Sequence, residues 1–489
     1  MMILFCFVIS FVCLSVCSKN SFLYPFNDWV DENAFFTIGR GWLQGMVPYR
    51  DLIDQKGPLL YFIFVVASLI SYDSFAGAFI IEIFSMTICL YYATKVIELY
   101  LDRKFSYLIL PLFASIMVSC LFFVHGGSAE EFCFPLLMVT LYKFLLYFKE
   151  KCISNRDLFW IGLTAGCIFM IKYTLIGFWF AFMFCIFIDL VKKKKYKKSI
   201  ISCLWFLLGM FIPIIVFVGY FWAVHSLKEF VDIYVLFNKN NYDVNFGLID
   251  RFKNLVQIFL RMLKINFVIF NLIDVGILYF VFSKKLLHDM WSKLSILIFV
   301  CCGVFTVYYG CKEFTYYFLI FIPLCLFGFI ALGMQIDKLF NSKIKYGLAI
   351  IVVLILSSYF VLKSNNLYYM KYNQKDLVQY KFADIIKSNG GKTLLNYGFL
   401  DGGFYLTSNI LPSTKYFMLL NADIPEMEAE LTKKIGHRKF DYIVVRSYEG
   451  FEPTTDVIRE NYELVATDEN VFEGRNFVYD LYQKKEGEL

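Results

Sequence analysis

Long apolar runs constrain the fold of this chain more than any other feature. A helix needs about 20 apolar residues to cross the hydrocarbon core of a bilayer, and about eleven runs come near that length. They cover residues 2–18, 75–98, 105–124, 132–148, 157–171, 173–190, 199–224, 264–282, 293–311, 315–334 and 346–362. Composition agrees, because 59% of the 489 residues are hydrophobic and 18% are charged, whereas soluble domains are about 25% charged. The sequence therefore predicts a polytopic α-helical membrane protein.

Short basic turns between the apolar runs predict their orientation, because cytoplasmic loops carry an excess of Lys and Arg. If the first helix runs from inside to outside, all five basic turns fall on the cytoplasmic face. They are Arg103 with Lys104, Lys149 with Lys151 and Arg156, residues 192–198, Lys284 with Lys285 and Lys293, and Lys338 with Lys343 and Lys345. We assign the net charge of +6 to this topology signal, and we expect no nucleic acid partner.

Two apolar segments need separate treatment. Residues 58–71 are too few for a comfortable span, and counting them as one would invert every later helix. We therefore predict a re-entrant or interfacial helix within the first external loop. Residues 2–18 resemble a cleaved signal peptide in length but lack a basic segment before the apolar run. An uncleaved first helix is the favoured interpretation.

The composition changes after Leu362, and residues 363–489 alternate strand-like and helix-like patterns. We predict strands at 393–397, 441–446 and 477–482, and helices near 375–388, 423–436 and 454–461. The predicted organisation is a transmembrane catalytic domain at 1–362 and an extracytoplasmic α/β domain at 363–489. The second domain has no recognisable catalytic motif, which leaves a lid, an acceptor-docking surface and a stabilising cap as alternatives.

The first external loop is unusually rich in paired charge. Asp31 and Glu32 are adjacent, and Arg40, Arg50 and Lys56 follow before the short apolar run. A general base near a membrane needs a carboxylate where an acceptor from water meets a lipid-borne donor. A polyprenyl-phosphate leaving group needs fixed cations at the depth of the headgroups. Ordinary solvated loop charges are the alternative, and they explain any single residue better than the whole arrangement.

These motifs resemble those of a known family. Asp31-Glu32, Gly45-x-x-Pro48-Tyr49-x-Asp51 and Lys56-Gly57-Pro58-Leu59-x-Tyr61 are similar to the first external loop of the C-type (GT-C) glycosyltransferases. The dolichyl-phosphate-mannose protein mannosyltransferases and the aminoarabinose transferases are the nearest groups. Gly57 replaces the first proline of the family's Lys-Pro-Pro-Leu motif. The resemblance extends over about residues 1–362 in helix number and loop placement, and its specific motifs precede residue 62.

The resemblance implies roles for residues in the first loop. Asp31 matches the family's catalytic acidic residue and Glu32 its supporting neighbour. Lys56 matches a lysine near the lipid phosphate, with Arg50 and Arg40 as further candidate phosphate ligands.

The second external turn and the following helix pair carry two more matches. Glu131, chosen over Glu130 because it starts the next span, matches a second acidic residue of the family. A carboxylate favoured by the positive end of the helix dipole is an equally good explanation of Glu131. Lys172 matches a lysine at the external end of a helix pair, where a phosphate contact is expected. Snorkelling of its ammonium group to the interface is the alternative.

The expected function is that of an inverting glycosyltransferase at the external membrane face. The donor would be a polyprenyl-phosphate sugar, and the acceptor a hydroxyl of an envelope glycopolymer, glycolipid or protein. A flippase or exporter of lipid-linked sugars and a non-catalytic assembly partner are the alternatives. We expect no cofactor, and the four His lack metal-ligand spacing. Metal dependence stays open, because Asp31, Glu32 and Glu131 could share a divalent ion. Glu82 and Asp274 lie within predicted spans without an assigned role.

Overall fold

The chain folds into two compact units in the computed structural model. The structure describes residues 1–241, 247–336, 343–420, 424–472 and 475–486, so Lys338 and the predicted helix start at 423 lie outside the described residues. The first unit comprises Met1–Ser18, Phe79–Gly219 and Val244–Tyr368, and the second comprises Lys19–Ala78, Tyr220–Asp243 and Tyr369–Leu489. The boundary at residue 362 was predicted between a membrane part and an aqueous part of the chain. The two compact units are defined by contacts and do not test that boundary, which stays a prediction.

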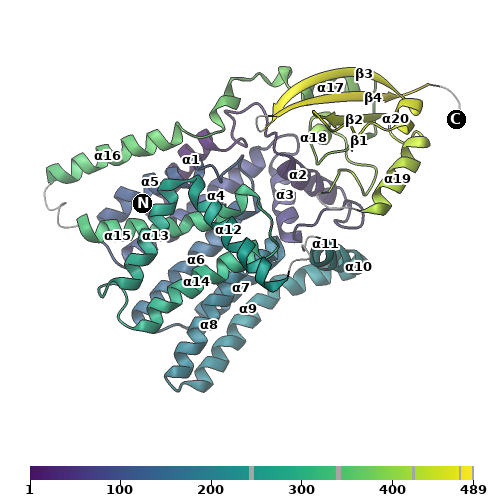
Figure 1. The fold of residues 1–489 in the computed structure, drawn as a ribbon. Helices are drawn as coiled ribbons and strands as arrows, with labels where there is room; N and C mark the ends of the chain where they lie inside the picture. The colour runs from purple at the N-terminus through teal and green to yellow at the C-terminus, as the bar shows by residue number, and fades with distance from the viewer. Residues whose placement is uncertain (242–246, 337–342, 421–423, 473–474, 487–489) are drawn as a thin grey trace. The chain divides into compact units, whose positions relative to one another are not determined.

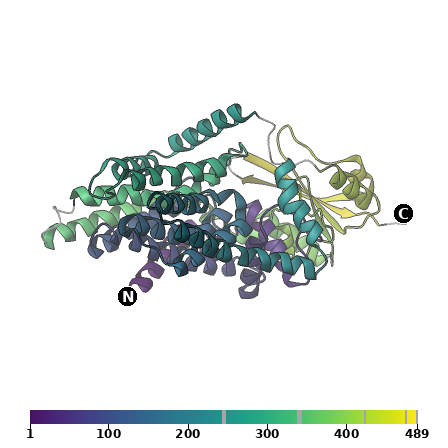
Figure 2. The ribbon, with the colours of Figure 1, turned by 90° about the horizontal axis from the view of Figure 1, so that it is seen from below.

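A helix lies at each of the predicted apolar runs. The helices are α1 (Met2–Cys17), α4 (Ala76–Glu98), α5 (Arg103–Ser119), α6 (Ala129–Glu150), α7 (Asn155–Lys172), α8 (Gly177–Lys192), α9 (Tyr196–Ala223), α13 (Phe267–Phe282), α14 (Met290–Tyr308), α15 (Cys325–Ile336) and α16 (Lys343–Val361). A 3₁₀ segment, Thr315–Leu324, leads into α15. Within the first unit the long helices α6, α7, α8 and α14 lie side by side (Figures 1 and 2).

Several of these helices have the length and apolarity of membrane spans. Among the described residues, six helices meet both requirements, or seven if the bent pair of α12 (Leu248–Ile265) and α13 counts as one span. The chain is thus a membrane protein. The expected count of eleven spans stays a prediction, because helices such as α1, with 16 residues, are only about 24 Å long. Helix α12 is amphipathic, and its apolar residues Leu255, Ile258 and Met262 are buried.

The connection between α1 and α4, residues 18–75, belongs largely to the second unit and contains two helices. They are α2 (Val30–Leu43) and α3 (Pro58–Ile70), which pack side by side (Figure 1). Their approach requires a small residue, because a Cβ on Gly39 would lie 2.6 Å from the Phe64 carbonyl carbon. Helix α3 has 13 residues and a length of about 20 Å. The short helix is confirmed, and its place at the membrane interface stays a prediction.

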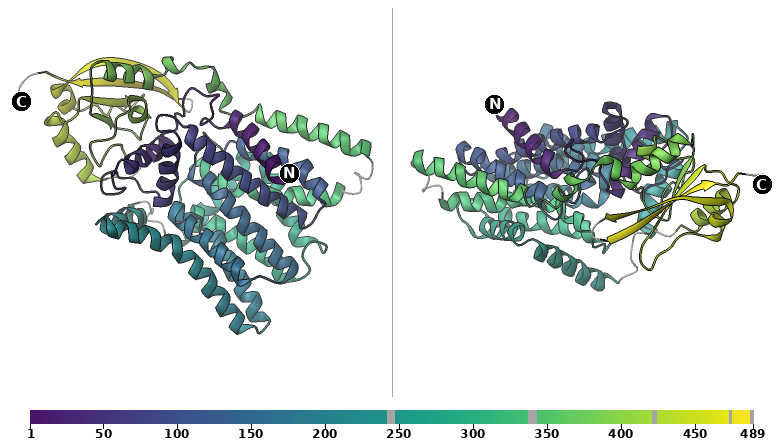
Figure 3. Two further views of the ribbon diagram at one scale, coloured as in Figure 1. Left: turned by 180° about the vertical axis from the view of Figure 1, so that it is seen from behind. Right: turned by 90° about the horizontal axis from the view of Figure 1, so that it is seen from above.

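The C-terminal residues form the predicted α/β structure. The sheet has the order β1-β2-β4-β3, with β1 parallel to β2 and the other pairs antiparallel. Figure 3 shows the long strands β3 and β4 running side by side. The elements are α17 (Val378–Ser388), β1 (Leu394–Tyr397), α18 (Phe404–Ser408), α19 (Pro425–Gly436), β2 (Tyr442–Ser447), α20 (Asp456–Asn461), β3 (Tyr462–Phe472) and β4 (Arg475–Lys484). All three predicted strands are confirmed, while the exposed edge strand β3 was not predicted.

Short segments complete the described structure. They are α10 (Leu227–Phe230), the π-helical turn Val231–Phe237, α11 (Asn238–Asn241) and the 3₁₀ turns Tyr173–Leu175, Leu367–Lys371 and Gln374–Asp376.

Within the second unit, the C-terminal residues pack directly on the α1–α4 connection. A Cβ on Gly403 would lie 2.3 Å from the Phe26 ring and 2.8 Å from the Asn33 side-chain oxygen. The Phe26 ring also meets the Tyr380 ring edge-on, with centroids 5.8 Å apart. Close packing leaves little room for movement. The C-terminal residues therefore restrain the segment that carries Asp31 through their contacts with Phe26 and Asn33.

Candidate functional site

The first turn of α2 presents the two adjacent acids. The helix begins at Val30 after the N-cap residue Trp29, so Asp31 and Glu32 lie where the helix dipole favours negative charge. Successive helical side chains point about 100° apart. Asp31 is partly exposed and Glu32 is fully buried. The Asp31 carboxylate therefore lies in a partly exposed environment, and the Glu32 carboxylate lies in a buried one.

Glu32 is held by side-chain amides from the preceding loop. Its Oε1 accepts a hydrogen bond of 2.6 Å from Asn20 Nδ2, and its Oε2 accepts one from Asn27 Nδ2. Asn27 also donates to Asn20 Oδ1 at 2.8 Å and accepts from the Trp29 N–H at 3.0 Å. Glu32 thus joins the loop to the start of α2, and its supporting role in catalysis stays a prediction.

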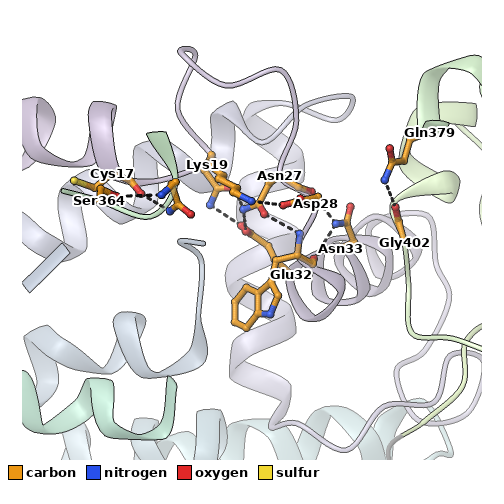
Figure 4. Close-up of polar contacts among 12 residues, drawn as sticks. Cys17, Lys19, Asn27, Asp28, Glu32, Asn33, Ser364, Gln379 and Gly402 are labelled. Atoms are coloured by element: carbon orange, nitrogen blue, oxygen red, sulfur yellow. Dashed lines mark hydrogen bonds and ion pairs between the residues drawn. The ribbon is translucent and has the colours of Figure 1, made fainter. Parts of the chain in front are cut away.

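A buried ion pair closes the same loop. Lys19 Nζ lies 2.6 Å from Asp28 Oδ1, with both side chains almost fully buried (Figure 4). Lys19 also lies over the Tyr369 ring, 4.3 Å from its centroid. Sequence reasoning missed Lys19, Asn20 and Asn27, because partners across an irregular loop have no fixed spacing in the sequence.

The backbone around Lys56 is held by two buried tyrosines. The Tyr61 hydroxyl accepts from the Lys56 N–H at 3.0 Å and donates to Asp54 Oδ2 at 2.8 Å. The Tyr49 hydroxyl donates to the Lys56 carbonyl at 2.7 Å. Asp54 is only 5% exposed. The backbone of Lys56 is therefore held in place by the Tyr49 and Tyr61 hydroxyls, and Asp54 in turn accepts a hydrogen bond from Tyr61.

Asp54 links the predicted acid to the predicted cation. Burial raises the pKa of the Asp54 carboxyl, while the positive charge of Lys56 and the hydrogen bond from Tyr61 lower it. The negative charge of Asp31 raises it further. Asp31 and Lys56 thus both interact electrostatically with Asp54, and these three residues are called the Asp31 cluster below. Sequence reasoning did not select Asp54, because burial alone separates it from a solvated loop carboxylate.

The two arginines have partners outside this cluster. Arg50 is exposed and donates two hydrogen bonds to Asp51, of 2.9 and 2.8 Å. The Arg50 guanidinium holds the pKa of the Asp51 carboxyl below its usual value. Arg40 is fully buried and donates to the Tyr405 carbonyl at 3.2 Å and to Asn409 Oδ1 at 2.5 Å. Phosphate binding by either arginine stays a prediction.

The remaining predicted residues lie in the first unit. Lys172 forms an ion pair with Glu130 and lies over the Tyr317 ring, 3.6 Å from its centroid. Glu131 lies in the first turn of α6, where its N–H donates to the N-cap residue Ser128 at 3.1 Å. The structure thus pairs Lys172 with Glu130, whereas the sequence analysis chose Glu131 as the candidate acid.

Glu82, which had no assigned role, lies beside the same turn. The Ser18 hydroxyl lies 3.1 and 2.9 Å from its two carboxylate oxygens. The Gly127 N–H lies 2.6 Å from Glu82 Oε1 and 2.9 Å from Glu131 Oε2. Glu82 and Glu131 therefore share one backbone donor, and Glu82 helps to position the turn that precedes α6.

A metal site has no direct support in the described part of the chain. No group of three or more His, Cys, Asp or Glu side chains among the described residues is arranged to hold a metal ion. The amide donors from Asn20 and Asn27 point at both oxygens of Glu32. A metal ion would have to displace these donors before Glu32 could bind it.

Comparison with known proteins shows the fold. No family model matches the chain, and no curated protein matches it. ArnT from Cupriavidus metallidurans bound to undecaprenyl phosphate matches with a TM-score of 0.62 at 12% identity, covering 98% of this chain and 97% of ArnT. Its apo structure matches with a TM-score of 0.60 at 12% identity, covering 97% and 96%. The apo oligosaccharyltransferase of Archaeoglobus fulgidus matches at 0.49 and 11% identity, covering 92% and 69%, which is too distant to support an argument.

Proposed function

The chain has the GT-C membrane fold, and from this premise we propose that it is a polyprenyl-phosphate-dependent glycosyltransferase. It would transfer a sugar from a polyprenyl-phosphate carrier to a hydroxyl of a cell-envelope glycopolymer, glycolipid or protein. The reaction would take place at the external face of a bacterial-type membrane, the same side as the C-terminal residues. The undecaprenyl phosphate bound to ArnT supports this class of carrier, because the likeness extends over nearly the whole chain.

The cluster of Asp31, Asp54 and Lys56 is the observation that supports the proposal most. A carboxylate and an ammonium group both interact electrostatically with the same buried acid, which supports a base and a cation acting in one site. Glycosyl transfer from a phosphate needs these two groups, because one removes a proton while the other balances charge.

Asp31 is proposed as the general base. It accepts the proton of the acceptor hydroxyl as that oxygen attacks the anomeric carbon opposite the phosphate. The bond between the anomeric carbon and the phosphate oxygen breaks, and its electron pair stays on the phosphate. A single displacement inverts the configuration. Glu32 keeps the first turn of α2 in place through Asn20 and Asn27.

Lys56 is proposed to stabilise the negative charge that grows on the departing phosphate. A fixed cation is most effective when its position is set before the reaction. Tyr49 and Tyr61 hold the Lys56 backbone, which supplies that preorganisation. Arg50, Arg40 and Lys172 are further candidate phosphate ligands, and Glu131 is the candidate second acid. Each of these side chains would have to leave its present partner before it could bind the substrate, as Lys172 would have to leave Glu130.

A flippase or exporter of lipid-linked sugars is the second candidate. Such a protein needs functional charges distributed along a transport path. Asp31, Asp54 and Lys56 instead gather in one connection between two helices, which favours the transferase.

Turnover by the purified full-length protein tests the proposal. The protein in detergent is supplied with a polyprenyl-phosphate sugar and with glycans released from the host envelope. Asp31→Asn is expected to lower kcat/KM at least about 100-fold, the usual contribution of a general base. Asp274→Asn, which makes the same change within α13 and outside the cluster, is the matched control and should keep wild-type turnover. Full activity of Asp31→Asn, or vesicle transport of the lipid-linked sugar without transfer, would contradict the proposal.

A further inference from the structure

A cleft of about 1060 Å³ lies at one end of the C-terminal sheet, and none of Asp31, Asp54 and Lys56 lines it. It is bounded by the turn that follows β2 and by the first residues of β4. Small-molecule sites occupy about 300–1,000 Å³. The cleft is therefore large enough for several sugar units of an extended ligand.

Two aromatic rings form an exposed platform in this cleft. Tyr448 and Phe451 are 38% and 36% exposed, and their rings stack with centroids 5.1 Å apart. The Phe477 ring supports Tyr448 edge-on at 5.6 Å. Holding two large apolar rings partly in water costs free energy unless a ligand covers them. Sugar rings have an apolar face of C–H groups that packs against aromatic faces.

Polar side chains surround the platform. Glu449, Arg475 and Asn476 line the cleft and are exposed. Among the described residues, neither Glu449 nor Arg475 has an ion-pair partner. A carboxylate accepts hydrogen bonds, a guanidinium donates them, and an amide does both. Sugar hydroxyls also donate and accept, so this lining matches a carbohydrate better than it matches a purely anionic or purely apolar ligand.

Strand β4, which contributes Val478 to the lining of the cleft, carries on its opposite face a side chain that interacts with the connection that carries Asp31. Val478 lines the cleft, and its neighbour Tyr479 forms a hydrogen bond with Arg446 and interacts electrostatically with Asp28. The Arg446 guanidinium lies over the Phe399 and Phe477 rings, 4.8 and 4.6 Å from their centroids. Asp28 is three residues from Asp31 in the sequence. Both lie in the second unit, so the cleft and the proposed base belong to one compact body.

We propose that this cleft binds the acceptor, and that the acceptor is an oligosaccharide chain. The assignment of the ligand as an acceptor rests on the proposed function, while the assignment of the cleft as a carbohydrate site rests on its own lining. The sugar rings stack on Tyr448 and Phe451, and their hydroxyls form hydrogen bonds with Glu449, Arg475 and Asn476.

Saturation-transfer NMR on the full-length protein in detergent tests this inference. The probe is the mixture of oligosaccharides released by mild acid from the host's own envelope glycans. We expect transfer to sugar C–H protons in the wild-type protein and a loss of affinity of about tenfold in Tyr448→Ala. Tyr372→Ala is the matched control, because Tyr372 is 41% exposed in the same unit and outside the cleft. Absence of transfer in the wild type, or wild-type affinity in Tyr448→Ala, overturns the inference.

A second measurement separates this inference from the proposed function. Slow transfer of the donor sugar to water is measured without any glycan present. Tyr448→Ala should keep this hydrolysis, while Asp31→Asn should lose it and still bind the oligosaccharides. If the wild type binds oligosaccharides through Tyr448 but never consumes the donor, the transferase proposal fails and the carbohydrate site stands.

Discussion

At the scale of single residues, nothing in the sequence around Asp54 marks it as important, yet it interacts with two of the candidate site residues. It is 5% exposed, and it interacts with the negative charge of Asp31 and the positive charge of Lys56. Replacing it leaves both of those groups in place, so its contribution can be measured separately from theirs. We propose that it positions Lys56, since its direct hydrogen bonds are to Tyr61 and to the backbone at Gln55.

We predict that Asp54→Asn raises KM for the polyprenyl-phosphate sugar about tenfold and changes kcat less than twofold. Hydrogen bonds to a charged group contribute about 1.5–3 kcal/mol, and the variant keeps only a neutral acceptor for Tyr61. Tyr61→Phe, which keeps the charge, should show a smaller rise. Steady-state kinetics at several donor concentrations measures both constants. Asp376→Asn, an exposed aspartate of the same unit, is the control, and a fall in kcat alone would contradict the positioning role.

At the scale of elements, the turn before α6 depends on two glycines. Gly126 has φ +104° and Gly127 has φ +75°, a region that residues with a Cβ rarely adopt. A Cβ on Gly126 would lie 2.2 Å from Ser18 Oγ and 2.8 Å from Glu82 Oε1. The turn therefore has room for the Glu82 carboxylate only because Gly126 lacks a side chain.

We predict that Gly126→Ala destabilises the protein by about 1–3 kcal/mol, the usual cost of a non-glycine residue in this backbone region. The thermal unfolding midpoint in detergent should fall. Adding Ser18→Gly should recover part of the loss, because it removes the closest contact but leaves the backbone strain. Gly219→Ala is the control, since no atom lies within 4 Å of a Cβ at that helical position. An unchanged midpoint in Gly126→Ala would contradict this account.

At the scale of the whole molecule, the chain's early connection and its C-terminal residues form one unit. Asp401 joins them: its carboxylate accepts from the Thr37 hydroxyl at 2.5 Å, the Gly403 N–H at 2.8 Å and Asn396 Nδ2 at 3.2 Å. Burial raises the pKa of Asp401 from 3.8 to about 6, although these hydrogen bonds oppose the rise. Asp401 therefore makes the stability of this unit depend on pH.

The direction of that dependence follows from proton linkage. The folded state binds the proton more tightly than the unfolded state, so the contribution of Asp401 is complete below pH 3.8 and is lost as pH rises through about 6. We predict that Asp401→Asn flattens the decline of the unfolding midpoint between these values, measured by thermal unfolding from pH 4 to pH 7. Asp376→Asn should keep the wild-type slope. An identical slope in Asp401→Asn would contradict the assignment.

Local patterns predicted much of the fold. The apolar runs place the helices of the first unit other than α12, and turn residues with strand-like apolar runs place β1, β2 and β4. Strand β3 was missed because four consecutive polar residues, 467–470, interrupt its apolar residues, and because it pairs on one side only. Asp31 and Lys56 were selected from their neighbours in the sequence, and their roles stay predictions.

Sequence by itself determined that this chain enters a membrane and where its helices lie, because hydrophobicity and helix length are properties of adjacent residues. Tertiary structure alone decided which polar groups are paired in the buried parts. Glu82 meets Ser18 across 64 positions and Gly127 across 45, and Arg40 meets Asn409 across 369. The physical reason is that a buried polar group must find a hydrogen-bond partner wherever the fold brings one within about 3 Å, and sequence spacing carries no record of that distance.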